Sequence, residues 1–249
     1  MNFNLDFPFD EEDDISMDAE MRFPGKSLIH PPIAEFRPLS LILKVGDQLS
    51  LSNYFLKDIL KNPTSFSTKT NASSPGSVSE SPYLEFDDAS PILQTYLKEI
   101  GLSKMDDLQK GLDPYESISF ELTQLRNIAL EKSLTELEQW LFGQKIETGH
   151  SLVQKWQSDP NTSLFIALSV GKMQALRIHL QPKNEDLIEN AASDIKIKFG
   201  ANKQITFSGS SKPTIAVQLC ELLQEDEKII IKDPSKGGGG GRGGVNPSG

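Results

Sequence analysis

The sequence is poor in the residues that build disulfides, metal sites and nucleophilic catalytic sites. It has one cysteine, Cys220, and three histidines, His30, His150 and His179. A single cysteine cannot form an intramolecular disulfide, and no two of these histidines have the short spacing of zinc ligands. No serine or cysteine stands in a nucleophile-elbow context. We therefore expect a protein that is not an enzyme and that binds no cofactor and no metal.

The sequence also lacks long hydrophobic runs. Hydrophobic residues make up 37% of the chain, whereas about 45–50% is typical of a compact globular protein. The longest apolar runs, such as residues 164–168, are far shorter than the ~20 residues that a membrane-spanning helix needs. The N-terminus is acidic, unlike a secretory or transit peptide. These absences predict an intracellular protein without membrane contact, and they do not distinguish the cytoplasm from the nucleus.

The negative charge is unevenly spread. The formal net charge is -10, and residues 1–20 contain eight acids with no lysine or arginine. Residues 85–149 are also acidic, whereas residues 150–235 are nearly neutral. This distribution argues against attraction of the whole protein to nucleic acid or to an anionic membrane, and it leaves room for a local basic face.

Residues 1–37 are expected to form an acidic disordered arm. Bulky hydrophobic residues stand among its acids, at Phe3, Leu5, Phe7 and Phe9. One interpretation is a solvated tail whose charge keeps the protein soluble. The other is a short linear motif that docks these four side chains into the groove of a partner protein.

Residues 38–61 form a short island of expected order. The run 38–45 has the Leu/Ile/Val content of a strand, Gly46 and Asp47 predict a turn, and Ser52 can cap a short helix. Residues 62–84 are rich in Ser, Thr and Pro and are expected to be a linker.

Residues 85–149 predict an acidic helical region. Helices are expected at 90–101, at 103–110, at 113–129 and, after Ser133, at 134–143, from apolar residues at helical spacing. Their apolar stripes would pack on the C-terminal domain or make the chain a homo-oligomer.

Residues 150–235 predict a small α+β domain of order ββαββαβ, with a mostly antiparallel sheet and helices on one face. The expected elements are a hairpin of strands 163–170 and 175–180, a helix capped by Asn184, a hairpin of strands 194–199 and 204–207, a helix from Pro213, and a strand at 228–232. Residues 236–249 are glycine-rich and are expected to be a disordered tail.

The segment between the last predicted hairpin and the last predicted helix is a candidate anion-binding site. Its residues are Ser208, Gly209, Ser210, Ser211 and Lys212. Free backbone N–H groups, the helix dipole, the hydroxyls and the lysine could together hold a phosphate. The alternative is an ordinary capped turn, in which the serines bond the N–H groups of the helix.

A basic strand face is the candidate nucleic-acid site. Lys196 and Lys198 point one way from their predicted strand, Arg177 lies in an earlier strand, Lys203 follows in a turn, and Arg242 stands in the glycine-rich tail. Sheet faces that bind RNA normally carry exposed aromatic side chains, which these positions lack.

The sequence therefore favours a non-enzymatic adaptor or assembly protein. It would bind protein partners through its α+β domain and its acidic N-terminal motif. The alternative is an RNA-binding accessory protein that uses the basic strand face and the tail. The layout is similar to that of viral phosphoproteins and transcriptional cofactors, with which the chain shares no motif.

Overall fold

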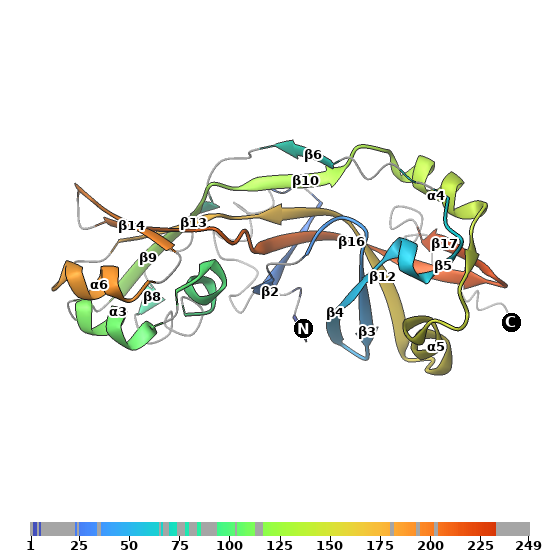
Figure 1. The fold of residues 1–249 in the computed structure, drawn as a ribbon, viewed down its shortest axis with the longest axis horizontal. Helices are drawn as coiled ribbons and strands as arrows, with labels where there is room; N and C mark the ends of the chain where they lie inside the picture. Colours follow the sequence, from blue (N-terminus) through green and yellow to red (C-terminus); the bar gives the residue numbers. More distant parts are fainter. Residues whose placement is uncertain are drawn as a thin grey trace, which may run out of the picture.

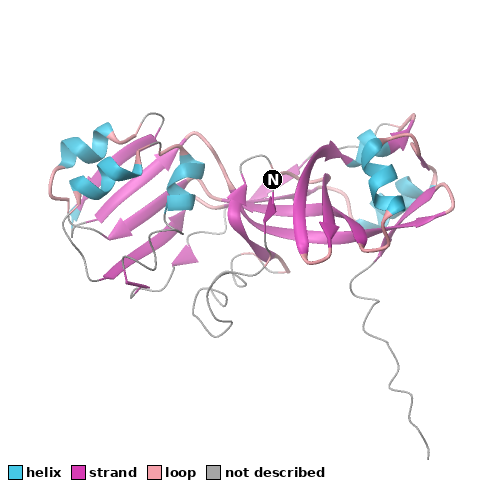
Figure 2. Cartoon of the chain, turned by 90° about the horizontal axis from the view of Figure 1, so that it is seen from below, coloured by secondary structure: helices cyan, strands magenta, loops and turns pink. Residues whose placement is uncertain are grey.

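A computed structural model gives the fold of the chain. It describes residues 2–3, 5, 23, 25–33, 36–64, 66, 70–73, 78–79, 84–85, 94–102, 104–112, 117–179, 182–192, 195–201 and 204–232. The molecule is elongated, with helices gathered at its two ends and strands running between them (Figures 1 and 2).

Strands dominate the described part of the chain. They are β1 (Asn2–Phe3), β2 (Ser27–Ile33), β3 (Ser40–Val45), β4 (Gln48–Phe55), β5 (Leu60–Lys61), β6 (Thr70–Ser73), β7 (Val78–Ser79), β8 (Leu84–Glu85), β9 (Ser117–Thr123), β10 (Arg126–Leu130), β11 (Lys145–Ile146), β12 (Thr162–Lys172), β13 (Ala175–His179), β14 (Ile195–Gly200), β15 (Gln204–Gly209), β16 (Thr214–Glu225) and β17 (Lys228–Lys232). The helices are the 3-10 helix η1 (Leu56–Ile59), a helix over residues 94–100, α3 (Met105–Gly111), α4 (Leu134–Phe142), α5 (Ser151–Ser158) and α6 (Glu185–Asn190).

The larger sheet occupies the centre and right of Figure 1 and is strongly curved and nearly closed. Its strands follow the order β1-β4-β3-β12-β10-β6, and β16 pairs with β12, β17 and β2. All of these pairings are antiparallel. The long strand β12 is central, because it pairs with β16 along one edge and with β3 and then β10 along the other.

The second sheet lies at the left of Figure 1, and we call this end of the molecule the tip. Its strands follow the order β14-β15-β13-β9-β7, and β8 also pairs with β9. The helices of the tip are 94–100, α3 and α6, and Figure 2 shows them on one side of its strands.

The buried apolar residues of the described ranges form three clusters along the length of the molecule. The tip core joins the tip helices to the second sheet; its members include Tyr96, Leu97, Ile100, Leu102, Leu108, Leu112, Leu176, Ile178, Ile188, Ala191, Ile205 and Phe207. A central core lies between β1, β2, β4 and the β12–β16 pair. The third core packs α4 and α5 on β3, β12, β16 and β17.

Local sequence signals explain several helix starts. The Ser133 hydroxyl accepts a hydrogen bond from the Glu136 N–H at 3.3 Å, and the Glu136 carboxylate accepts one from the Ser133 N–H at 2.9 Å. This reciprocal pair is a capping box and begins α4. At α6, the Asn184 side chain accepts from the Leu187 N–H at 3.3 Å.

Several predictions from the sequence are confirmed. The strand over 38–45 is β3, and the turn at Gly46 and Asp47 follows it, with Gly46 at φ 58°. The helices α3, α4 and α6, the β14–β15 hairpin and the strand β17 also lie where the sequence places them.

Two predicted helices are wrong. Residues 113–129 do not form one helix, because β9 and β10 occupy 117–130. Pro213 does not begin a helix either, because residues 214–225 form the twelve-residue strand β16. The first four residues of β16 are all buried, so this strand lacks the apolar–polar alternation that marks a strand with one exposed face.

Two further expectations about connectivity are wrong. Strands β12 and β13 do not pair with each other, since β12 lies in the larger sheet and β13 in the second. Ser52 caps no helix, because it lies within β4, where its hydroxyl donates to the Leu41 carbonyl at 2.7 Å.

The expected fold class, a small α+β domain with helices on one face, is therefore wrong. The strands between 150 and 235 are divided between two sheets, which also include strands from the first half of the chain. The helical region expected to mediate self-association contributes β9 and β10 to these sheets. The arm expected to be disordered contributes β1 and β2, and Phe3 in β1 is only 2% exposed.

Candidate functional site

The two sheets share a strand ladder that runs from one sheet into the other. Thr123 at the end of β9 pairs with Ala175 at the start of β13, in the second sheet. In the larger sheet, Arg126 of β10 pairs with Lys172 of β12. Arg126 lies three residues after Thr123, and Lys172 lies three residues before Ala175. The antiparallel register is thus unchanged across the junction between the sheets. The segments β9–β10 and β12–β13 behave as two long strands that bend together.

A third strand segment follows the same register. Ser73 of β6 pairs with Asn127 of β10 in the larger sheet. In the second sheet, Val78 of β7 pairs with Leu122 of β9. Val78 lies five residues after Ser73, and Leu122 lies five residues before Asn127, so the register is the same. The pairings of β6 and of β7 therefore share one register with β10 and β9, in the larger sheet and in the second sheet.

The fourth strand segment, β15–β16, is paired on the other side of β12–β13 with one irregularity. Ser208 pairs with Ala175, and Thr214 pairs with Lys172. Six residues of one strand thus face three of the other, which is the effect of a bulge. The Met173 N–H donates to the Pro213 carbonyl at 3.0 Å, and the Gly209 N–H donates to the Gln174 carbonyl at 3.2 Å. These bonds keep the strands together across the junction.

The ladder consists of two hairpins side by side. We call β6–β8 with β9–β10 the first hairpin, and β12–β13 with β15–β16 the second, to which we count β14 because it pairs with β15. The connection within the first hairpin contains the helix 94–100 and α3, and the connection within the second contains α6. Both connections lie at the tip (Figure 1).

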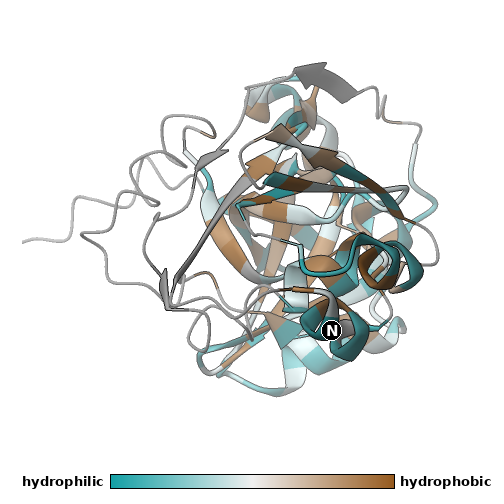
Figure 3. Cartoon of the chain, turned by 90° about the vertical axis from the view of Figure 1, so that its left-hand side faces the viewer, coloured by the Kyte–Doolittle hydropathy of each residue, from teal (hydrophilic) through white to brown (hydrophobic). Residues whose placement is uncertain are grey.

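Strands β9, β14 and β15 of the tip alternate between apolar and polar residues. In β15, Ile205 and Phe207 are fully buried, whereas Gln204, Thr206 and Ser208 between them are half-buried. The sequence of β9, SISFELT, and that of β14, IKIKFG, follow the same period of two. In Figure 3, which views the molecule from the tip, brown and teal residues follow one another along the strands. The second sheet is thus amphipathic.

The apolar face of this sheet is covered by the tip helices. Leu176, Ile178, Ile205 and Phe207 share the tip core with Tyr96, Leu97, Ile100, Leu108 and Ile188 of the helices, and each of these side chains is fully buried. Removing the helices would therefore leave an apolar surface spanning several paired strands.

The opposite face carries the basic residues that the sequence singled out. Lys198 of β14 pairs with Thr206 of β15, and Thr206 pairs with Arg177 of β13, so these residues stand in one row across three strands. Lys196 lies two residues from Lys198 on the same exposed face. Lys203 and Arg242 lie outside the described residues. The structure thus brings together the strand residues of the basic face.

The candidate anion site does not begin a helix. Ser208 and Gly209 end β15, and residues 210–213 lead into β16. The helix dipole on which this prediction depended is therefore absent. The Lys212 carbonyl accepts a hydrogen bond from the Lys172 ammonium at 3.1 Å.

Lys172, at the junction of the sheets, has a strongly lowered pKa. Burial, together with the nearby charges of Arg37 and Lys212, lowers the pKa of Lys172 from 10.5 to about 8. Lys172 ends β12, at the point where the ladder passes into the second sheet.

The proposed N-terminal motif is partly built into the fold. Phe3 is buried in the central core, with its ring centroid 5.3 Å from that of Phe36. Leu5 packs against the same core. Phe7 and Phe9 lie outside the described residues.

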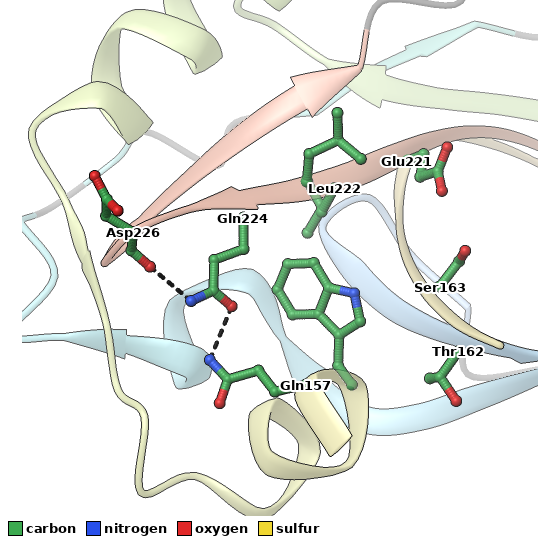
Figure 4. A pocket seen from close by; sticks show the side chains of 9 residues that line it. Gln157, Thr162, Ser163, Glu221, Leu222, Gln224 and Asp226 are labelled. Carbon is green, nitrogen blue, oxygen red and sulfur yellow. Dashed lines mark hydrogen bonds between the residues drawn. The ribbon is translucent and has the colours of Figure 1, made fainter. Parts of the chain in front are cut away.

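A pocket of about 510 Å³ lies between α5 and the β16–β17 hairpin (Figure 4). Several of its polar groups bond one another or, for Glu221, the neighbouring Lys232. Gln157 donates to Gln224 at 2.8 Å, Gln224 donates to the Asp226 carbonyl at 2.6 Å, and Glu221 pairs with Lys232 at 2.7 Å. Among the residues that the structure describes, no three His, Cys, Asp or Glu side chains gather closely enough to hold a metal ion. No helix in the described ranges has both the length and the apolar character needed to cross a membrane.

Comparison with known proteins gives one family. The model of the bacterial gasdermin family matches residues 29–233. Among solved structures, the chain is similar to a bacterial gasdermin from Bradyrhizobium tropiciagri, with 17% sequence identity and a TM-score of 0.57 over 89% of this chain and 91% of that chain. It is also similar to the gasdermin A3 membrane pore, at 13% identity over 83% of this chain and 88% of that chain, but a TM-score of 0.40 is too low to establish a shared fold. No curated protein sequence matches the chain.

Proposed function

This chain belongs to the bacterial gasdermin family, and from that membership we propose that it is a membrane pore-forming effector. Many copies would assemble on a lipid bilayer and insert their two hairpins across it. The proposed activity is permeabilisation of a membrane and involves no chemical catalysis. We also propose that the chain is made inside the cell before it reaches its target membrane.

Family membership overturns the functions expected from the sequence. The non-enzymatic adaptor with an acidic linear motif is wrong, and so is the RNA-binding alternative, because the family is one of pore-forming proteins. The expectation of no membrane contact is wrong for the same reason. That expectation depended on the lack of a long apolar run, a criterion that detects helices only.

The single observation that carries the proposal is the amphipathic strand ladder. A wall between lipid and water needs strands with one apolar and one polar face, which is a sequence period of two. The tip strands have this period, with Ile205 and Phe207 on one face and Lys196, Lys198 and Arg177 on the other. In an inserted hairpin, the first set would contact lipid and the second would face water.

The strand lengths also suit a bilayer. A membrane-spanning strand needs about 9–11 residues. In the larger sheet, β12 has 11 residues and β16 has 12. Because β12 continues in register into β13, straightening the junction would lengthen the strand without any change of partner.

The four strand segments of one copy cannot enclose a channel alone, so the proposal requires a ring of copies. In such a ring each copy contacts its neighbours through two different surfaces, and the repeated rotation closes the assembly.

Release of a trapped dye tests this function. Lipid vesicles made from bacterial polar lipids and loaded with a self-quenching dye would be mixed with the purified chain. The measurement would be repeated after limited proteolysis, which cuts preferentially in exposed terminal segments. We expect dye release in at least one of these forms, growing more than linearly with protein concentration. Intact vesicles under both conditions would reject the proposal.

A further inference from the structure

The connections of the two hairpins contact each other directly at the tip. Leu102 pairs with Ala192, and Leu112 pairs with Pro182, each as an isolated antiparallel bridge. Leu112 lies ten residues after Leu102, whereas Pro182 lies ten residues before Ala192. The segments 102–112 and 182–192 therefore lie antiparallel, each with a helix, α3 or α6, between its two bridges.

The two segments approach each other closely at Gly111, the last residue of α3. Its carbonyl oxygen accepts hydrogen bonds from the Lys183 N–H at 2.7 Å and from the Asn184 N–H at 3.0 Å, directly before α6. A Cβ on Gly111 would lie 2.6 Å from Cγ1 of Ile188, so the backbone of α3 approaches α6 as closely as only glycine allows.

Apolar side chains fill the rest of the interface. Leu102, Leu108 and Leu112 come from the connection of the first hairpin, and Ile188 and Ala191 come from that of the second. All five are at most 6% exposed. The interface is therefore a packed part of the tip core.

A second close approach joins the same two units. Gly209 ends β15 of the second hairpin, and a Cβ placed on it would collide with the carbonyl oxygen of Ile100, in the connection of the first hairpin. The two hairpins are thus interlocked at both Gly111 and Gly209.

We propose that this interlock, the tip clasp, is a conformational latch: the connections 102–112 and 182–192 must separate before the hairpins can enter a membrane. The inference rests on the proposed pore-forming function. The helices that cover the apolar face are α3 and α6, which lie within these two segments, and the helix 94–100, which directly precedes the first of them. As long as the connections hold each other, neither set of helices can leave the sheet independently, and the apolar face stays covered.

A reversible cross-link tests the latch. Leu102→Cys/Ala192→Cys, in a Cys220→Ala background, joins two residues opposed in an antiparallel bridge, a geometry compatible with a disulfide. We expect the oxidised protein to sediment with vesicles but to release dye at least tenfold more slowly than the reduced protein, and added reductant to restore the rate. The matched control is Val45→Cys/Gln48→Cys, which links the turn between β3 and β4 outside both hairpins.

The outcomes separate the latch from the pore. Equal dye release from the oxidised and reduced forms would overturn the latch and leave the pore-forming function intact. No release from any form, including the unmodified chain, would overturn both.

A second variant tests the latch without cysteines. Gly111→Ala should loosen the clasp and speed dye release several-fold, whereas Gly143→Ala, where a Cβ would meet no atom closer than 3.8 Å, should leave the rate unchanged. Release that is equal in the two variants would count against the latch.

Discussion

The aromatic ring of Phe23 lies against the bare Cα of Gly171, so closely that a Cβ on the glycine would come within 2.6 Å of ring atom Cε1. Phe23 is fully buried and belongs to the tip core, whereas Gly171 lies in β12 of the larger sheet, one residue before the strand ends. The contact therefore fastens the segment ahead of β2 to the junction where the strand ladder passes between the sheets.

Gly171→Ala should destabilise the fold. Three atoms of the Phe23 ring would lie under 3.0 Å from the new Cβ, and overpacking of this kind typically costs about 1–3 kcal/mol. Urea unfolding would measure the loss, with Gly143→Ala as the control at an uncrowded glycine. A leucine at position 23 would leave room for the new Cβ. Phe23→Leu should therefore lower the free energy of unfolding less in the Gly171→Ala background than in the wild type. Additive costs of the two changes would contradict this account of the contact.

Charge reversal on the polar face of the tip should change the ion selectivity of the pore. Lys196 and Lys198 are exposed, so Lys196→Glu/Lys198→Glu should leave folding intact. In the proposed pore both residues face water, and residues lining a channel tune its selectivity. We expect the reversal potential in planar bilayers to shift toward cation preference. Lys57→Glu/Lys61→Glu, two exposed residues outside the hairpins, should not shift it.

Lys172 should make stability depend on pH in the alkaline range. Its pKa in the folded chain, about 8, lies below its ordinary value of 10.5. Between these values the unfolded chain binds more protons, so the contribution of Lys172 to stability rises with pH across this window and is lost as the pH falls through it.

The comparison with Lys172→Met isolates this contribution from other titrating lysines. The free energy of unfolding of the methionine variant, minus that of the wild type, should increase as the pH is lowered from about 10.5 to about 8. A difference that stays constant over this range would show that Lys172 titrates alike in both states.

The capping box of α4 should be worth a measurable part of the stability. Ser133→Ala removes the hydroxyl that accepts from the Glu136 N–H, and loss of such a cap costs about 0.5–2 kcal/mol. Ser133→Thr keeps a hydroxyl that can accept from the Glu136 N–H and donate to the Glu136 carboxylate, and it should retain most of the stability in urea unfolding. Equal losses in the two variants would mean that the hydroxyl is not the source of the stabilisation.

Elements fixed by local signals could be predicted from the sequence. Ser133 and Asn184 begin α4 and α6 where a capping residue precedes an apolar stripe. The alternation of Lys196 and Lys198 with apolar residues places β14 and its exposed face correctly. In each case the signal lies within a few residues of the element that it specifies.

The errors arise where tertiary packing overrides the local pattern. In β16, Ile215, Leu219 and Leu222 have helical spacing, but this strand is buried on both faces in its first half and so shows no alternation. The sequence of β9, SISFELT, does alternate strictly, and this signal could have identified the strand. The division of β12 and β13 between two sheets depends on distant partners, so the candidate site could not be assembled from local sequence.

The most direct test of the membrane-inserted ladder is the accessibility of spin labels along β14. Single cysteines would be placed at 195, 196, 197, 198 and 199 in a Cys220→Ala background, labelled, and measured on vesicles with lipid-soluble oxygen and with a water-soluble nickel chelate. Insertion predicts that oxygen accessibility peaks at 195, 197 and 199 and nickel accessibility at 196 and 198, because side chains alternate between the faces of a strand. Accessibility without this period of two, or unchanged from the protein in solution, would contradict the account.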